Sequence, residues 1–492
     1  MNGNMEVPKG WIKVSLAEIA TYINGRAFKP KEWSKEGLPI IRIQNLNREI
    51  SEFNFCNFAV DEKYYVNKGD LLFAWSGTPG TSFGAHIWTG GRAVLNQHIF
   101  RIIVDEKKIS KKYYLHALNH KVKEFVNKAH GTAGLAHITK KKFEESMLPL
   151  PPLAEQQRIV AKIEELFSSL DKGIESLKTA QQQLKVYRQS VLKWAFEGKL
   201  TKSTLRQAQG AVIPVAQGTV KPVTQGAVMP VAKGAVMPVA QDAVKPVAEP
   251  VEATNKESEF PEGWEWVKIE DVADMQAGIA FKKSEYSSHG VRLFQIANVS
   301  FNFIKWEEIE YLPVKYIDQY PELLLNIGDI VMALNRPMLN NQLKIAEIRK
   351  DDVPAILYQR VGRFKFFGNL FNRYFLYYLQ SPLFIRWLNE QLQGVNIPFI
   401  NKAKLLRYDR FPLPSSIEEQ HRIVAEIESR LSVCDKIEES IEESLRQAEA
   451  LRQSILKKAF EGKLVAQDPN DLPASTLLAR IKAEREKNKK NK

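Results

Sequence analysis

Cysteine and long apolar runs are scarce in this sequence. Its two cysteines, Cys56 and Cys434, lie far apart in the chain, which argues against a disulfide framework and a zinc cluster and is typical of a reducing compartment. No segment approaches the roughly 18 consecutive apolar residues of a membrane span. The beginning, MNGNMEVPKGW, has no apolar run of the signal-peptide type. We therefore expect a cytoplasmic protein without a membrane segment.

Motifs that carry chemistry are also missing. No glycine-rich phosphate loop followed by Lys-Ser or Lys-Thr occurs, and Gly77, Gly80 and Gly84 lack the strand–turn–helix context of a nucleotide site. Residues 396–399 (NIPF) resemble the Asn-Pro-Pro-aromatic motif of amino-methyltransferases, but they have one proline where that motif has two. The histidines show no metal-ligand spacing. We expect no catalytic residue, no metal and no cofactor bound by this chain itself.

Positive charge, in contrast, is in excess. The chain has 70 Lys and Arg against 57 Asp and Glu, a formal net charge of +13 and a pI of about 9.3, which favours a polyanionic partner. Its 492 residues are 44% hydrophobic and 10% aromatic, enough for the cores of two or three domains.

The sequence repeats itself. PKGW (residues 8–11) returns as PEGW (residues 261–264), and AFEGKL (residues 195–200) returns unchanged at residues 459–464. Between these landmarks, GRAFK matches GIAFK, and PLPPLAEQQRIV matches PLPSSIEEQHRIV. We infer a duplicated unit, each copy consisting of a globular domain followed by a long helix.

Each long helix carries a heptad pattern. Apolar residues alternate at spacings of four and three, which indicates a coiled-coil seam. A helix over residues 155–200 is roughly 69 Å long, and Gly198 and Gly462 suit the helix ends. An alternative is two independent amphipathic helices, each packed on its own domain. The predicted seam consists of Ile163, Leu170, Leu177, Leu184, Val191, Ile427, Cys434, Ile441 and Ile455.

The globular parts have mixed patterns. Residues 38–46 (LPIIRIQNL) and 69–75 (GDLLFAW) are typical of strands, whereas 113–126 and 374–388 have helical spacing. We predict an α+β fold, in which two mixed α/β domains are separated by two long helices with an internal pseudo-two-fold repeat.

A segment of different composition lies between the two halves. Residues 209–248 are five copies of an eight-residue unit with a proline at every eighth position, which forbids a continuous helix and predicts an extended or disordered insert. The predicted segments are a first domain (1–150), a first helix (151–202), a linker (203–259), a second domain (260–414), a second helix (415–466) and a basic tail (467–492).

Residues suited to nucleic-acid contact gather in two matching loop regions. Arg, Asn, Gln and Lys can pair with base edges, while Ser, Thr and Lys hold phosphates. The candidates of the first half are Arg42, Asn45, Trp75, Ser76, Thr78, Thr81, Asn96, Gln97 and His98. Those of the second half are Gln295, Asn298, Asn335, Arg336, Asn340, Asn341, Gln342, Lys344, Gln359 and Arg360.

Taken together, the paired endings PLPPLAEQQRIV…AFEGKL and PLPSSIEEQHRIV…AFEGKL, the strand GDLLFA, the segment LNQHIFR and the basic tail resemble the specificity subunit of type I restriction-modification systems. The resemblance covers nearly the whole chain except about residues 203–259. It implies two target-recognition domains that each read half of an asymmetric bipartite site in duplex DNA, and an antiparallel coiled coil between them. It also implies partners: two methyltransferase subunits that carry S-adenosylmethionine, and restriction-translocase subunits that use ATP and Mg.

Other interpretations stay open at this point. A specificity subunit whose partner is a fused methyltransferase-nuclease would have the same sequence features. A coiled-coil adaptor with protein-binding domains would bind DNA weakly and without the steep salt dependence that phosphate contacts cause.

The insert leads to a first prediction. Because its prolines prevent added helical turns and the heptads end before it begins, deleting residues 209–248 should leave both half-sites and their spacing unchanged. Mapping methylated sites in cells that carry the deletion variant, beside cells that carry the full chain, tests this. A change of even one base pair in the gap would make the insert a structural part of the spacer.

Overall fold

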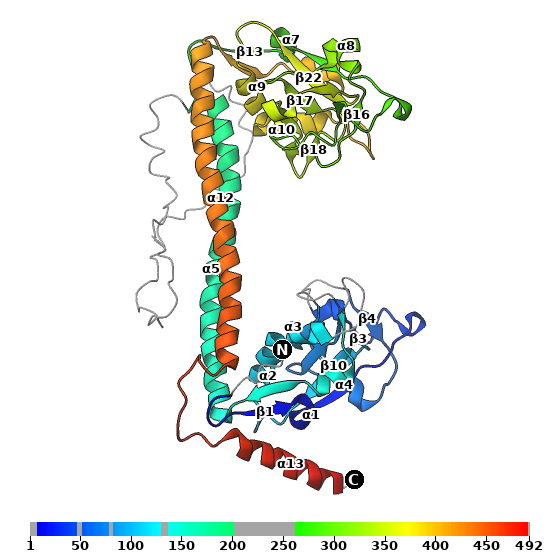
Figure 1. Ribbon diagram of the computed structural model, residues 1–492, viewed down its shortest axis with the longest axis vertical. Helices are drawn as coiled ribbons and strands as arrows, with labels where there is room; N and C mark the ends of the chain where they lie inside the picture. Colours follow the sequence, from blue (N-terminus) through cyan, green and yellow to red (C-terminus); the bar gives the residue numbers. More distant parts are fainter. Residues whose placement is uncertain (1–6, 47–51, 78–81, 129–135, 201–260, 491–492) are drawn as a thin grey trace. The chain divides into compact units, whose positions relative to one another are not determined.

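The computed structural model describes residues 7–46, 52–77, 82–128, 136–200 and 261–490. The chain divides into two compact units: unit 1 consists of Met1–Ala180 and Ser440–Lys492, and unit 2 of Gln181–Glu439. The long helices α5 (Leu153–Phe196) and α12 (Ile417–Phe460) each contribute one part to each unit (Figure 1). The insert lies outside the described residues.

Unit 1 is built on two four-stranded sheets and a strand pair. The first sheet is antiparallel, in the order β2 (Thr21–Asn24), β10 (Ile99–Ile103), β6 (Leu71–Ala74) and β8 (Gly84–Ile87). The second has the order β4 (Asn54–Cys56), β3 (Leu38–Ile41), β9 (Ala93–Leu95) and β5 (Tyr65–Val66), with β3 and β9 parallel. The pair joins β1 (Ile12–Ser15) to β12 (Met147–Leu150).

Unit 2 repeats this plan. Its antiparallel sheet has the order β14 (Ala273–Ala277), β22 (Val361–Phe366), β17 (Ile330–Ala333) and β20 (Ile345–Glu347). Its second sheet has the order β16 (Tyr311–Leu312), β15 (Val291–Phe294) and β21 (Ala355–Leu357), with β15 and β21 parallel. The strand pair is β13 (Trp264–Val267) with β23 (Phe411–Pro414), and a hairpin is formed by β18 (Met338–Leu339) and β19 (Gln342–Leu343). The predicted duplication is confirmed at the level of topology.

Short helices complete each unit. Every residue of β6 (LLFA) and of β17 (IVMA) is fully buried, because these central strands are covered on both faces. The short helices of unit 1 are α1 (Leu16–Ile19), α2 (Lys111–His120), α3 (Val122–Lys128) and α4 (Lys140–Glu144). Those of unit 2 are α7 (Ile269–Val272), α8 (Tyr316–Gln319), α9 (Asn372–Leu379), α10 (Pro382–Gln391) and α11 (Lys402–Leu406).

The helix predictions over 113–126 and 374–388 are confirmed, although each segment forms two helices with a short break between them. In unit 2, Ser381 caps α10 by accepting a hydrogen bond from the backbone N–H of Phe384 at 3.4 Å. Pro382, the first residue of α10, has no N–H with which to extend α9. The strand predictions are confirmed by β3 and β6, although residues 43–46 form a 3₁₀ turn.

Within each unit, α5 and α12 pair side by side and antiparallel (Figure 1). In unit 2, Arg188 forms ion pairs with Asp435 at 2.7 Å and Glu438 at 2.9 Å. In unit 1, Arg452 pairs with Asp171. These contacts between the two helices rule out independent packing of each helix on its own domain.

The residues of the predicted seam are buried or half-buried. Its residues in α12 recur every seventh position and are buried, and so is Ala448, which continues the same series. In α5, Ile163, Leu184 and Val191 are buried, whereas Leu170 and Leu177 are half-buried.

The helix ends dock on the opposite repeat. Gly198 follows α5 in the left-handed conformation (φ 67°), and a Cβ there would overlap the ring of Pro261. Gly462 follows α12 in the same conformation (φ 70°), and a Cβ there would overlap the ring of Pro8. Each copy of the AFEGKL ending therefore lies against the P-x-G-W segment of the other repeat, and glycine is required because this approach leaves no room for a side chain.

The basic tail contains a helix that the sequence analysis did not predict. α13 (Ala474–Lys490) packs on unit 1: the backbone N–H of Ala474 donates to Gly10 O at 2.9 Å, and Arg485 donates to Ala17 O at 2.6 Å. Lys482 forms an ion pair with Glu18 at 2.9 Å, and Ile481 is buried.

The seam leads to a stability prediction, and an exposed residue of the same helix provides its control. Leu184 is 2% exposed and Val186, two residues further along the same helix, is 64% exposed. Leu184→Ala should reduce the free energy of unfolding by about 2–5 kcal/mol, because it leaves a cavity in the seam. Val186→Ala should change it by no more than about 0.5 kcal/mol. Urea unfolding followed by circular dichroism measures both, and equal effects would contradict the seam.

Candidate nucleic-acid interface

Three segments far apart in sequence meet at one edge of unit 1. The backbone N–H of Trp75, directly after β6, donates to His98 O at 3.0 Å, and the N–H of Ile138 donates to Trp75 O at 3.1 Å. The strand β7 (Ser76–Gly77) pairs with β11 (Ala136–His137). The indole of Trp75 lies 4.9 Å from the ring of His98 and 4.5 Å from the ring of His137, centroid to centroid. The candidates Trp75, Ser76 and His98 are thus brought together.

The same three segments meet in unit 2. The N–H of Leu334 donates to Arg360 O at 2.9 Å, and the N–H of Ile400 donates to Leu334 O at 3.0 Å. Asn335 forms a bridge with Phe399. The backbone of this convergence is therefore shared by both units, whereas its side chains differ: Trp75, His98 and His137 in one, and Leu334, Arg360 and Phe399 in the other.

The middle segment is a left-handed turn in both units. His98 has φ 75° and Arg360 has φ 68°. The preceding residues are held by the backbone: Gln97 N–H donates to Arg26 O at 2.9 Å, and Gln359 N–H donates to Ile279 O at 3.0 Å. A positive φ at a residue other than glycine costs on the order of 1–3 kcal/mol and is concentrated at functional sites. Because it recurs at equivalent positions, we include this turn in the candidate site.

Asn45 and Asn298 make equivalent hydrogen bonds in the corresponding loops of the two units. The Asn45 Oδ1 accepts from Arg42 N at 2.9 Å, and its Nδ2 donates to Glu52 O at 3.3 Å. The Asn298 Oδ1 accepts from Gln295 N at 2.7 Å, and its Nδ2 donates to Lys305 O at 2.8 Å. Both side chains are buried and shape the loop, so a contact of either amide with a base stays a prediction with little support.

Other candidates are also engaged within the fold. Arg42 donates to Gln44 Oε1 at 2.7 Å and lies over the ring of Trp33. Lys344 donates to Ile296 O at 3.0 Å, and burial lowers the pKa of its ammonium group. Ser76 is buried and Asn96 is half-buried. Thr78 and Thr81 lie outside the described residues.

The exposed candidates are concentrated on turns. In unit 2, Arg336, Asn340 and Asn341 all have positive φ and surround the hairpin β18–β19, in which Gln342 is also exposed. In unit 1, Gln97 is exposed and His98 is half-buried. Burial and the nearby His137 lower the pKa of the His98 imidazole, so its neutral form is favoured at neutral pH.

The loop before Phe399 was not among the predicted site residues. Gln393 and Phe399 exchange two backbone hydrogen bonds of 2.9 Å, and Val395 between them is 99% exposed. Pro398 O accepts from Arg336 N at 2.6 Å, so the NIPF segment lies beside the candidate turn. Its exposed apolar side chains suit contact with thymine methyl groups. His137 and Phe399 were missed because nothing in the sequence places them beside Trp75 and Asn335, which lie far earlier in the chain.

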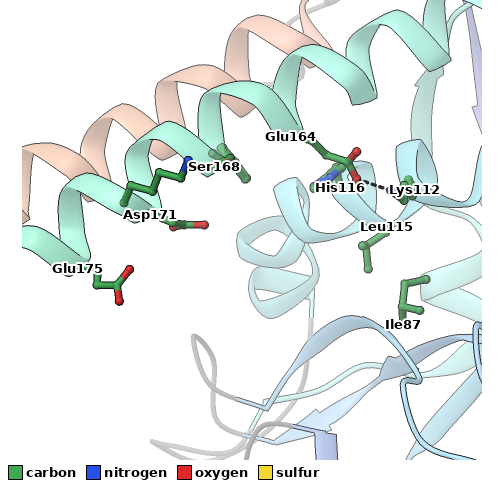
Figure 2. Close-up of a pocket in the computed structure, with 10 residues that line it drawn as sticks. Ile87, Lys112, Leu115, His116, Glu164, Ser168, Asp171 and Glu175 are labelled. Atoms are coloured by element: carbon green, nitrogen blue, oxygen red, sulfur yellow. Dashed lines mark hydrogen bonds and ion pairs between the residues drawn. The ribbon is translucent and has the colours of Figure 1, made fainter. Parts of the chain in front are cut away.

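A hollow in unit 1 has several carboxylates in its lining. A cavity of about 500 Å³ lies between α2 and α5, and Glu164, Asp171 and Glu175 line it from α5 (Figure 2). Glu164 is paired with Lys112 at 2.7 Å. A phosphate would thus meet three carboxylates. The described residues contain no group of three or more His, Cys, Asp or Glu arranged to hold a metal ion.

No helix in the described ranges combines the length and apolar character needed to cross a membrane.

Comparison with known proteins identifies clear relatives. The model of the family described as type I restriction modification DNA specificity domain matches residues 8–185 and 261–447. The MjaVIII specificity subunit of the type I restriction enzyme from Methanocaldococcus jannaschii is 30% identical, over 95% of this chain and 96% of that protein. The EcoBI specificity subunit from Escherichia coli is 27% identical, over 99% of this chain and 94% of that protein.

Solved structures share the fold. A chain from a study of complex assembly and conformational transition of the type I R-M system has a TM-score of 0.62 at 19% identity, covering 93% of this chain and all of that one. The HsdS subunit from Thermoanaerobacter tengcongensis has a TM-score of 0.51 at 18% identity, covering 94% of this chain and 99% of that one.

Candidates whose side chains bond within the fold and candidates whose side chains are exposed should differ in their effect on the free energy of unfolding. Asn298→Ala leaves two part-buried backbone groups, Gln295 N–H and Lys305 O, without their partner and should cost about 1–3 kcal/mol of unfolding free energy. Gln342→Ala, at an exposed position of β19, should change it by less than about 0.5 kcal/mol. Urea unfolding of the two variants is the measurement. Normal stability of Asn298→Ala together with lost DNA binding would make Asn298 a base reader instead.

Proposed function

The chain belongs to the type I restriction-modification DNA specificity family, and we propose that it selects an asymmetric bipartite duplex site and carries no catalysis itself. One observation supports this most strongly: the same three-segment convergence occurs once in each unit with different side chains. Because the backbone is equivalent in the two units, each unit presents its side chains to DNA in the same way. Because the side chains differ, the two units select different base sequences.

Affinity comes from positive charge. The net charge of +13 favours phosphate contacts, which hold the chain on duplex DNA without reading its sequence. Exposed turn residues such as Gln97, Arg336 and Arg360 then contact base edges. Positioning and reading are therefore assigned to different residues.

The paired helices act as the spacer and as the docking surface for partner subunits. The antiparallel seam and the ion pairs of Arg188 and Arg452 hold α5 and α12 together within each unit. We assign S-adenosylmethionine to two methyltransferase subunits, and ATP with Mg to restriction-translocase subunits, because this sequence has no phosphate loop or glycine-rich cofactor motif.

The test is a methylation map. Host cells that carry the gene should show one modified bipartite motif with two unlike half-sites and a fixed gap, and a deletion strain should lose it. A continuous or perfectly palindromic motif would contradict the proposal.

Purified components provide the second readout. The isolated chain should transfer no labelled methyl group, and addition of the methyltransferase subunit should produce transfer. Affinity of the complex for its duplex should fall linearly on a log–log plot against salt, with a slope of about −0.9 for each phosphate contacted. Binding that is insensitive to salt would favour a protein adaptor.

A further inference from the structure

Arg360 has a fixed backbone and a free side chain. Its O accepts from Leu334 N at 2.9 Å, and the two residues before it donate their N–H groups to Ile279 O and Phe294 O, both at 3.0 Å. Its guanidinium is exposed and makes no hydrogen bond, ion pair or ring contact with the described residues. An arginine kept in a costly left-handed turn, without a partner in the fold, is available to a partner outside it.

We propose that Arg360 reads a guanine in the half-site recognised by unit 2. The inference rests on the proposed function, which supplies the duplex. A guanidinium presents two parallel N–H donors, and the guanine edge in the major groove presents the acceptors O6 and N7 at matching spacing. Binding of this kind needs a rigid base for a long side chain, and the turn provides it.

Neighbouring side chains do not compete for this role. Gln359 donates to the Tyr358 hydroxyl at 3.3 Å, Lys344 to Ile296 O, and Asn298 to Lys305 O. Arg336 follows shortly after Leu334, whose N–H donates to Arg360 O, and it is also exposed and adds a second positive charge. No acidic side chain is paired with either arginine in the described part of the chain. The patch therefore attracts an electronegative edge such as that of guanine.

Unit 1 differs at the equivalent position. His98 replaces the arginine there, and its ring packs 4.9 Å from Trp75 and 6.0 Å from His137. A half-buried imidazole that favours the neutral form offers no fork of donors. The guanine contact is thus specific to unit 2, and His98 provides an internal comparison.

The experiment uses the full chain with its methyltransferase subunit and the duplex found by methylation mapping. Each guanine of both half-sites is replaced in turn by 7-deazaguanine, which lacks the N7 acceptor. For the unaltered chain, one such replacement in one half-site should weaken binding about 5- to 150-fold.

Arg360→Ala should weaken binding to the unmodified duplex by a similar factor and abolish the sensitivity to that one replacement. Arg360→Lys should restore little, because an ammonium retains the charge without the planar fork. Arg407→Ala, which removes an exposed arginine at the end of α11, should leave the sensitivity intact. His98→Asn should also leave it intact, since Asn tolerates the left-handed backbone.

The outcomes separate the two proposals. If the complex of the unaltered chain selects no duplex, the proposed function fails. If it selects a bipartite duplex and Arg360→Ala remains as sensitive to the same 7-deazaguanine, the two losses are independent, and the guanine assignment is overturned while the function stands.

Discussion

The exchange of helix ends between the two repeats is the constraint on which the rest of the structure depends. Ala195 and Phe196, at the end of α5, are fully buried in the core of unit 2, and Ala459 and Phe460, at the end of α12, are buried in the core of unit 1. Each globular domain is therefore completed by a helix that belongs to the other repeat. Close packing makes such a core intolerant of a missing element, so neither repeat is a self-sufficient folding unit.

The candidate recognition surfaces depend on this arrangement indirectly, through the strands that the cores hold in place. The cores hold the central strands β6 and β17, and the ends of those strands carry Trp75 and Leu334 into the convergence. Backbone hydrogen bonds join the three segments in both units, and in unit 1 the ring contacts of Trp75 with His98 and His137 add to them. In unit 2 the exposed side chain of Arg360 takes no part in joining the segments, while the buried amides of Asn45 and Asn298 shape the loops nearby.

Periodic features were predictable from the sequence, and convergent ones were not. The duplication and the heptads that bury Ile427, Cys434 and Ile441 are local patterns with a fixed spacing. The break at Ser381 was missed because helical spacing continues across it, and α13 was missed because its polar surface has little periodicity. Of the residues at the three-segment convergence, Arg360 and His98 were among the predicted candidates, whereas Phe399 and His137 reach it only through tertiary pairing.

The left-handed turn also has an evolutionary consequence. Since its geometry is set by main-chain groups, the residue at positions 98 and 360 can be exchanged without rebuilding the fold, and the two copies already differ there. Under the proposed function, mutational drift at such a position would alter which sequences are marked as self while the scaffold is inherited unchanged. A host lineage can thereby diversify its molecular signature through single codons, and invading DNA adapted to one signature meets another.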